Sequence, residues 1–148
     1  MDKDYAEIEV SSPTLKEILM SYNHDQKFRV KDAKTATKFI EGILLGMVRI
    51  PIIYDIRKED EIILGKDKLD LLKLFTLNDF KLEKSALTTV HYGDGWFTDL
   101  NCSLRERWMQ TTNVVQIWAN PSEMSKDRIK DMSDCLNFYP FPEFLEVL

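Results

Sequence analysis

Residues 39–75 place a helix, two strands and a second helix in direct succession, and this order constrains the fold more than any other stretch. Apolar side chains recur at helical spacing up to Met47, and Gly46 can adopt the left-handed conformation that ends a helix. Residues 48–54 are rich in β-branched side chains, as in a buried strand, although Pro51 favours an edge or a bulge. This half of the stretch therefore predicts a helix that leads into a strand.

The second half returns through a charged link over 55–61 to another strand, and Gly65 then opens a helix. At such a strand-to-helix turn, the backbone N–H groups of the first helical turn point at an anion. Lys66, Asp67 and Lys68 follow directly, so a phosphate could lie between the glycine and the two lysines. The sequence therefore predicts a ligand site at Gly65, Lys66, Asp67 and Lys68. A solvent-facing lysine pair at a helix start is the simpler alternative.

The remaining elements follow from capping residues, alternation and turn signals. We expect a strand at 8–10, a short helix capped by Thr14, an extended segment at 23–31, a helix capped by Asp32, strands at 80–82 and 86–92, a turn at 93–95, a helix that Ser103 caps and that ends near 110, a strand over 113–119 with Val115 and Ile117 on one face, and an amphipathic helix from 121 to about 136. Together these elements predict an α+β fold in which a small mixed sheet packs with helices.

Composition is that of an ordinary globular domain. The 148 residues are 44% hydrophobic and 30% charged, so we expect a single domain over residues 1–148. No apolar run approaches the roughly 18 residues of a membrane span, so we expect no membrane partner and a cytoplasmic protein. Cys102 and Cys135 have no partner at ligand spacing, as expected for reduced thiols. The net charge of −5 weakens any non-specific DNA-binding role.

Several phrases of the sequence occur in the order found in one known family. F-I-E-G-I-L-L-G-M, I-P-I-I-Y and I-I-L-G-K-D-K-L-D-L-L-K-L-F succeed one another within residues 39–75. Shorter matches lie at 26–29, 80–82, 95–100 and 136–137. On these phrases, residues 12–138 resemble the ParB/sulfiredoxin-like N-terminal domain of the GmrSD-type modification-dependent restriction endonucleases. The resemblance implies a ParB/sulfiredoxin-like fold.

The resemblance also implies a function, from which this sequence departs at one motif. The family's D-G-Q-Q-R motif is associated with nucleotide binding and hydrolysis, so the resemblance implies a nucleotide with Mg²⁺ as the cofactor. Here the matching residues begin with Leu64 in place of the acid, and Lys68 stands in place of the arginine. Phosphoryl transfer needs a carboxylate for the metal and a fixed cation for the phosphates. Leucine supplies neither and lysine lacks arginine's fork, so we assign no catalytic residue.

Other candidate sites carry simpler structural alternatives. Gln26 and Arg29 lie in a basic segment that could contact a nucleic-acid backbone or be a solvated loop. Trp108, on the same predicted helix as Arg105 and Arg107, could stack on a base, although a core position is the more ordinary one for a tryptophan. His91 beside the 93–95 turn suggests acid–base work only weakly. The aromatic tail Phe138–Leu148 is either a homodimer or partner contact or a lid over the core.

Three functions therefore compete at this stage. The first is a catalytically silent binding module, a regulator or antagonist of a defence system in a host, viral or mobile-element setting. It would act through a protein, nucleotide or nucleic-acid partner. The second is a nucleoside-triphosphate hydrolase in which Asp67 or Asp70 replaces the lost acid. The third is a ParB-type DNA-binding module that uses Arg29, which the net charge opposes.

Overall fold

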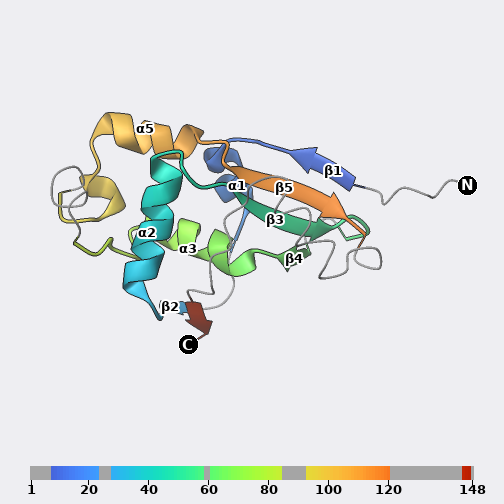
Figure 1. Ribbon diagram of the computed structural model, residues 1–148, viewed down its shortest axis with the longest axis horizontal. Coiled ribbons are helices and arrows are strands. Elements are labelled where there is room, and N and C mark those ends of the chain that lie inside the picture. Colours follow the sequence, from blue (N-terminus) through green and yellow to red (C-terminus); the bar gives the residue numbers. More distant parts are fainter. Residues whose placement is uncertain (1–7, 24–27, 59–60, 85–92, 121–144, 148) are drawn as a thin grey trace, which may run out of the picture.

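A computed structural model describes residues 8–23, 28–58, 61–84, 93–120 and 145–147, which form an α+β fold (Figure 1). The elements in chain order are β1 (Ile8–Ser11), α1 (Leu15–Ser21), β2 (Phe28–Val30), α2 (Ala33–Leu44), β3 (Ile50–Asp55), β4 (Ile62–Leu64), α3 (Lys66–Thr76), the 3-10 helix η1 (Phe97–Asp99), α5 (Cys102–Gln110), β5 (Val114–Ala119) and β6 (Leu145–Val147). The expected α+β class is thus confirmed. Within these ranges, no helix has both the length and the apolar composition that crossing a bilayer requires.

The main sheet is small and mixed, as the sequence predicts. Its strand order is β1-β5-β3-β4, with β3 and β5 parallel and the two outer strands antiparallel to their neighbours (Figure 1). The register pairs Ile50 with Val114 at one end of the parallel pair and Tyr54 with Trp118 at the other. A separate two-stranded sheet joins β2 to β6 near the C-terminus.

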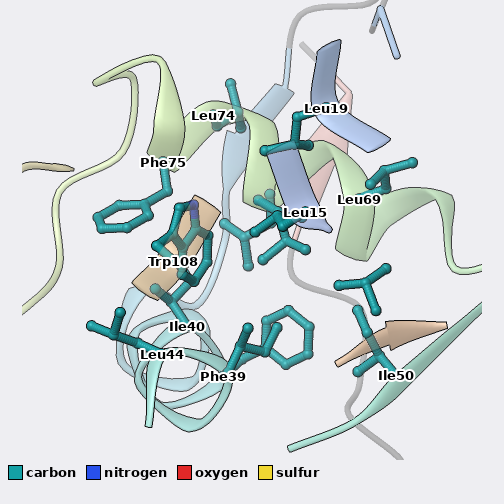
Figure 2. Close-up of a cluster of buried hydrophobic side chains, with 14 of the residues drawn as sticks. Leu15, Leu19, Phe39, Ile40, Leu44, Ile50, Leu69, Leu74, Phe75 and Trp108 are labelled. Atoms are coloured by element: carbon teal, nitrogen blue, oxygen red, sulfur yellow. The ribbon is translucent and has the colours of Figure 1, made fainter. Parts of the chain in front are cut away.

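Four helices pack on one face of this sheet and share a single apolar core. Trp108 of α5 is fully buried and meets Phe75 of α3 edge-on, with ring centroids 5.2 Å apart. Figure 2 shows these two rings beside Ile40 and Leu44 of α2. The indole N–H of Trp108 donates to Thr76 Oγ1 at 2.9 Å, which satisfies the one polar group of the side chain. Trp108 is therefore a core residue, and the interpretation of it as a base-stacking residue is wrong.

The opposite face of the sheet is buried as well. Ile53, Val115, Ile117 and Ala119 are each at most 1% exposed, yet they lie outside the core cluster that the four helices share. The expectation that Val115 and Ile117 share a face is confirmed by the register with β3. A sheet buried on both faces explains why β3 and β5 read as nearly continuous apolar runs.

Capping explains where three helices begin. Thr14 and Glu17 form the expected capping box of α1, and the Asp32 side chain accepts a bond from the backbone of α2, as predicted. The expected cap of α5 is wrong by two residues. Asn101 accepts from Leu104 N at 2.9 Å, so Ser103 lies inside the helix.

Two segments of the central unit differ from expectation. Helix α2 ends at Leu44 rather than 47, and Gly46 with φ +74° turns the chain out, as expected of a left-handed stop. Pro51 lies in an internal strand rather than an edge strand, because β5 pairs on one side and β4 on the other. The β4 ladder, however, reaches only Ile53 and Tyr54 and shifts register there, so β3 has no β4 partner at Pro51.

The strand expected at 80–82 is wrong. These residues are irregular, and Leu82 is buried while its N–H donates to Gly95 O at 2.9 Å across the confirmed 93–95 turn. One bond of this kind holds a loop to a turn without starting a ladder. The strand expected at 86–92, His91, the helix from 121, and Cys135 lie outside the described residues.

Candidate functional site

The turn at Gly65 has the geometry that the sequence predicts. Gly65 has φ +93° and precedes α3 as its N-cap, with no side chain capping the helix. A Cβ at this position would lie 2.7 Å from the carbonyl oxygen of Pro51. Both the left-handed backbone and the close approach therefore require glycine here.

Each of the two lysines of the predicted site faces an aspartate. Lys68 Nζ lies 3.3 Å from Asp67 Oδ2, and Lys66 Nζ lies 3.7 Å from Asp70 Oδ2. Asp70 is 1% exposed, whereas the Lys66 side chain is 47% exposed. Salt bridges of this kind offset the positive charge that a phosphate would need.

Asp70 is held by a second donor, Tyr22, at the end of α1. The Tyr22 hydroxyl donates to Asp70 Oδ1, and Lys66 Nζ donates to the Tyr22 oxygen at 3.1 Å. The ammonium also lies 5.6 Å from the Tyr22 ring centre and 6.0 Å from that of Phe28. A buried carboxylate needs such donors to offset its lost hydration. Asp70 therefore fixes Lys66 and Tyr22 in place.

The side chains at this turn do not fit a magnesium–nucleotide site. Asp67 and Asp70, the two carboxylates considered as replacement ligands, each lie against an ammonium group. Leu64, which stands where the family's acid would be, ends β4 with an apolar side chain. In the part of the chain that the structure describes, no three metal-ligating side chains gather. Mg²⁺ prefers carboxylate and phosphate oxygens in octahedral geometry. Here the carboxylates of Asp67 and Asp70 already form salt bridges with Lys68 and Lys66.

A groove of about 730 Å³ lies beside this turn. Its walls come from the end of α1, from Glu61 just before β4, from Ile62 of β4, and from Lys66. Its floor is the end of β3 and β5. Ligand pockets in proteins typically measure about 300–1,000 Å³. The groove therefore has the size of a ligand site, and Lys66 is the residue of the predicted site that reaches it.

The floor of the groove is aromatic and polar. Tyr54 and Trp118 stack with ring centroids 5.0 Å apart and planes 17° from parallel. Gln116 Nε2 donates to the Tyr54 hydroxyl at 2.9 Å. No described residue hydrogen-bonds the side-chain amide oxygen (Oε1) of Gln116 or the Trp118 indole N–H, and both side chains are only half-buried. An acceptor and a donor are thus left for a ligand.

The other candidate residues that the structure describes do not line the groove. Arg29 is exposed in β2, where its Cα partner is Glu146 of β6, and the preceding residue Phe28 lies near Lys66. Arg107 donates to the Leu45 carbonyl at 3.2 Å, away from the groove. Gln26 lies outside the described residues. Whether these residues, or Gly65 to Lys68, bind a ligand stays a prediction.

The structure describes part of the C-terminal segment Phe138–Leu148, which the sequence suggests as a dimer or partner contact. Residues 145–147 form β6 and pair antiparallel with β2 of the same chain, while 138–144 and 148 are not described. This part of the tail therefore returns to its own chain. A homodimer through Phe138–Leu148 stays a prediction for the rest.

The sequence analysis missed most of the groove. Tyr54, Gln116 and Trp118 share one sheet face because they alternate with the buried apolar residues of the other face. That alternation was visible in the sequence, since Gln116 and Trp118 flank Ile117. Tyr22 and Asp70 carried no such signal, because they lie 48 residues apart.

Comparison of the chain with models of known families, with curated proteins and with solved structures gave no match. The resemblance to ParB/sulfiredoxin-like domains therefore rests on the sequence phrases alone. The geometry of the groove is the stronger guide to function.

Proposed function

We propose that this chain is a catalytically silent, ParB-like binding module whose groove beside Lys66 receives a partner. It would act as a regulator or antagonist in a host-defence or mobile-element setting. The observation that carries the proposal is the groove floor, where stacked aromatic rings lie beside a hydrogen-bond acceptor and donor that no described residue uses. Aromatic side chains with one polar end are typical of binding surfaces.

The loss of catalysis rests on the chemistry of the turn. Leucine replaces the acid of the motif that the sequence resembles, and both lysines are offset by aspartates. A phosphate entering here would have to displace these aspartates or lie among them. Recognition without reaction fits these side chains better than phosphoryl transfer does.

A phosphate-release assay separates this proposal from the hydrolase alternative. Each of the four nucleoside triphosphates is incubated with Mg²⁺ and with wild type, Lys68→Ala, Asp67→Ala or the control Lys16→Ala, an exposed position on α1. We expect no release above the protein-free rate in any sample. Release by wild type and Lys16→Ala that disappears in the other two variants would overturn the proposal.

A capture experiment tests the groove itself. Wild type, Asn23→Arg and Met20→Arg are used as immobilised bait for an extract of the native host; Asn23 lines the groove, while Met20 is exposed on α1 outside it. We expect a partner that wild type and Met20→Arg retain and that Asn23→Arg loses. Equal retention by all three baits would contradict a role for the groove.

The DNA-binding alternative is tested on the same material. We expect no retention on duplex DNA at physiological salt, given the net charge of −5. Salt-dependent retention that Arg29→Ala abolishes would favour the ParB-type alternative instead.

A further inference from the structure

We infer that the groove binds an extended, uncharged, proline-containing segment of a partner protein, with Gln116 and Trp118 as the residues that bond its backbone. This inference rests on the proposed function, since it names the class of partner for the same groove. Its basis is the spacing of the polar groups, the local charge and the aromatic lining of the groove floor.

The spacing of the unused polar groups favours an extended chain over a single ring. Gln116 and Trp118 lie two residues apart on β5 and on the same face, so their Cα atoms are about 6.7 Å apart. A nucleobase presents its neighbouring donor and acceptor on one edge, where a single side-chain amide spans both. An extended peptide repeats its N–H and C=O groups along its length. Two separate side chains can then bond it at two places.

Local charge favours an uncharged partner. Lys66 is offset by buried Asp70, and Glu61 at the groove wall pairs with Lys58 at 3.3 Å. A nucleotide would bring at least one phosphate to a wall that already holds the carboxylate of Glu61. Among the described lining residues, the one cationic side chain is that of Lys66, which Asp70 already offsets. A neutral peptide brings no such repulsion and loses no hydrated charge on binding.

The aromatic lining favours proline. Tyr22, Tyr54 and Trp118 all line the groove, and the rings of Tyr54 and Trp118 stack on each other. Proline-rich segments dock in aromatic-lined grooves because their polyproline II conformation is already formed before binding. The Trp118 indole N–H can donate to a peptide carbonyl, and the Gln116 oxygen can accept from the N–H of a residue other than proline.

The test follows the indole N–H signals of the full chain by ¹⁵N NMR. The probe is an end-blocked peptide of alternating proline and alanine, compared with peptides in which lysine or glutamate replaces alternate alanines, and with AMP. Trp118→Phe assigns the groove signal. Trp108 is an internal control because its N–H is already bonded to Thr76, and Trp96 lies outside the groove lining.

We expect the Trp118 signal alone to move with the uncharged peptide. Gln116→Met should weaken this binding about three- to tenfold, the effect of one lost hydrogen bond, whereas Gln110→Met at an exposed position of α5 should not change it. If Gln116→Met does not fold, the comparison among the four probes decides. No movement at millimolar peptide, or equal movement with a charged peptide, would overturn the inference. Movement with AMP alone would also overturn it, but would leave the groove as a binding site and so the proposed function intact.

Discussion

The two ends of one sheet face differ sharply in this protein. At the start of β3 and β5, Ile50 and Val114 are 2% and 0% exposed beneath the four helices. At the other end of the same two strands, Tyr54 and Trp118 form the floor of a groove. There the side-chain oxygen of Gln116 accepts no hydrogen bond from any described residue. The same ladder of backbone bonds runs under both ends. The difference therefore lies in the side chains and in how the helices cover them, and it teaches that a binding surface can be made from the continuation of a core.

Trp108, which is buried in the core, and Trp118, which is half-buried in the groove floor, should differ most in how much they stabilise the fold. Trp108→Ala should lower the free energy of unfolding by about 3–5 kcal/mol, because it leaves a large cavity against Phe75 and removes the hydrogen bond that Thr76 Oγ1 accepts from the indole. Trp118→Ala at the open end should cost only about 1–2 kcal/mol. Urea unfolding of both variants measures this difference. Equal losses would mean that the groove floor is as much a part of the core as Trp108.

The buried carboxylate behind the groove gives the next largest effect. Asp70→Asn keeps an oxygen for Tyr22 but removes the charge that holds Lys66, so we expect a loss of about 2–3 kcal/mol of stability. Asp67→Asn is the matched control on the same helix turn, and it should cost less than about 1 kcal/mol because its pair with Lys68 is closer to solvent. Thermal and urea unfolding check both values. A harmless Asp70→Asn would show that the carboxylate is not needed to hold the groove wall.

A comparison of Gly65 with Gly46 tests whether close packing at the turn before α3 requires glycine. Gly65→Ala should cost about 1–2 kcal/mol more than Gly46→Ala, although both residues have positive φ. The reason is space: a Cβ on Gly65 meets the Pro51 oxygen at 2.7 Å, whereas the nearest atom to one on Gly46 is 3.7 Å away. The comparison by urea unfolding isolates the close contact from the backbone strain. Equal costs would mean that the contact relaxes freely.

The smallest effect concerns the turn after β3. Hydrogen bonds from the Arg57 side chain hold the pKa of Asp55 below its usual value of 3.8, with the backbone N–H of Arg57 adding a further bond. The stability gained from ionised Asp55 is then fully present above that usual value and is lost as pH falls through the lowered pKa.

The pH dependence of unfolding tests this turn. Arg57→Met should move the acid loss of stability to higher pH, and Asp55→Asn should make that loss smaller. Stability of each variant between pH 2 and 6 gives the measurement. An unchanged acid limb in Asp55→Asn would exclude this carboxylate as a source of the pH dependence.

Much of the frame could be predicted from the sequence because its signals are local. Thr14 and Asp32 cap helices through bonds within three residues, and β-branched runs mark β3 and β5. The α5 cap was misplaced because Asn101 and Ser103 both carry capping oxygens, and only the backbone decides between them. The strand expected at 80–82 is absent for another reason: its apolar residues Phe80 and Leu82 are buried in the shared core as part of an irregular segment that joins no ladder.

The groove could not be predicted in the same way, because its parts come together only in the fold. Tyr22 meets Asp70 over 48 residues, and Tyr54 meets Gln116 over 62. From the sequence, Asp70 was considered as a replacement metal ligand, whereas its burial and its bond from Tyr22 arise only in the fold. The lysines of the predicted site were identified from sequence, but the pairing of Lys66 with Asp70 was not.

Hydrogen exchange of the tryptophan indole protons tests most directly the claim that one end of the sheet face is sealed and the other open. We predict that the Trp118 N–H exchanges within the dead time of the experiment, while Trp108, bonded to Thr76 inside the core, is protected close to the free energy of global unfolding. A bound partner in the groove should slow Trp118 alone. Equal protection of the two indoles in the free protein would contradict this account.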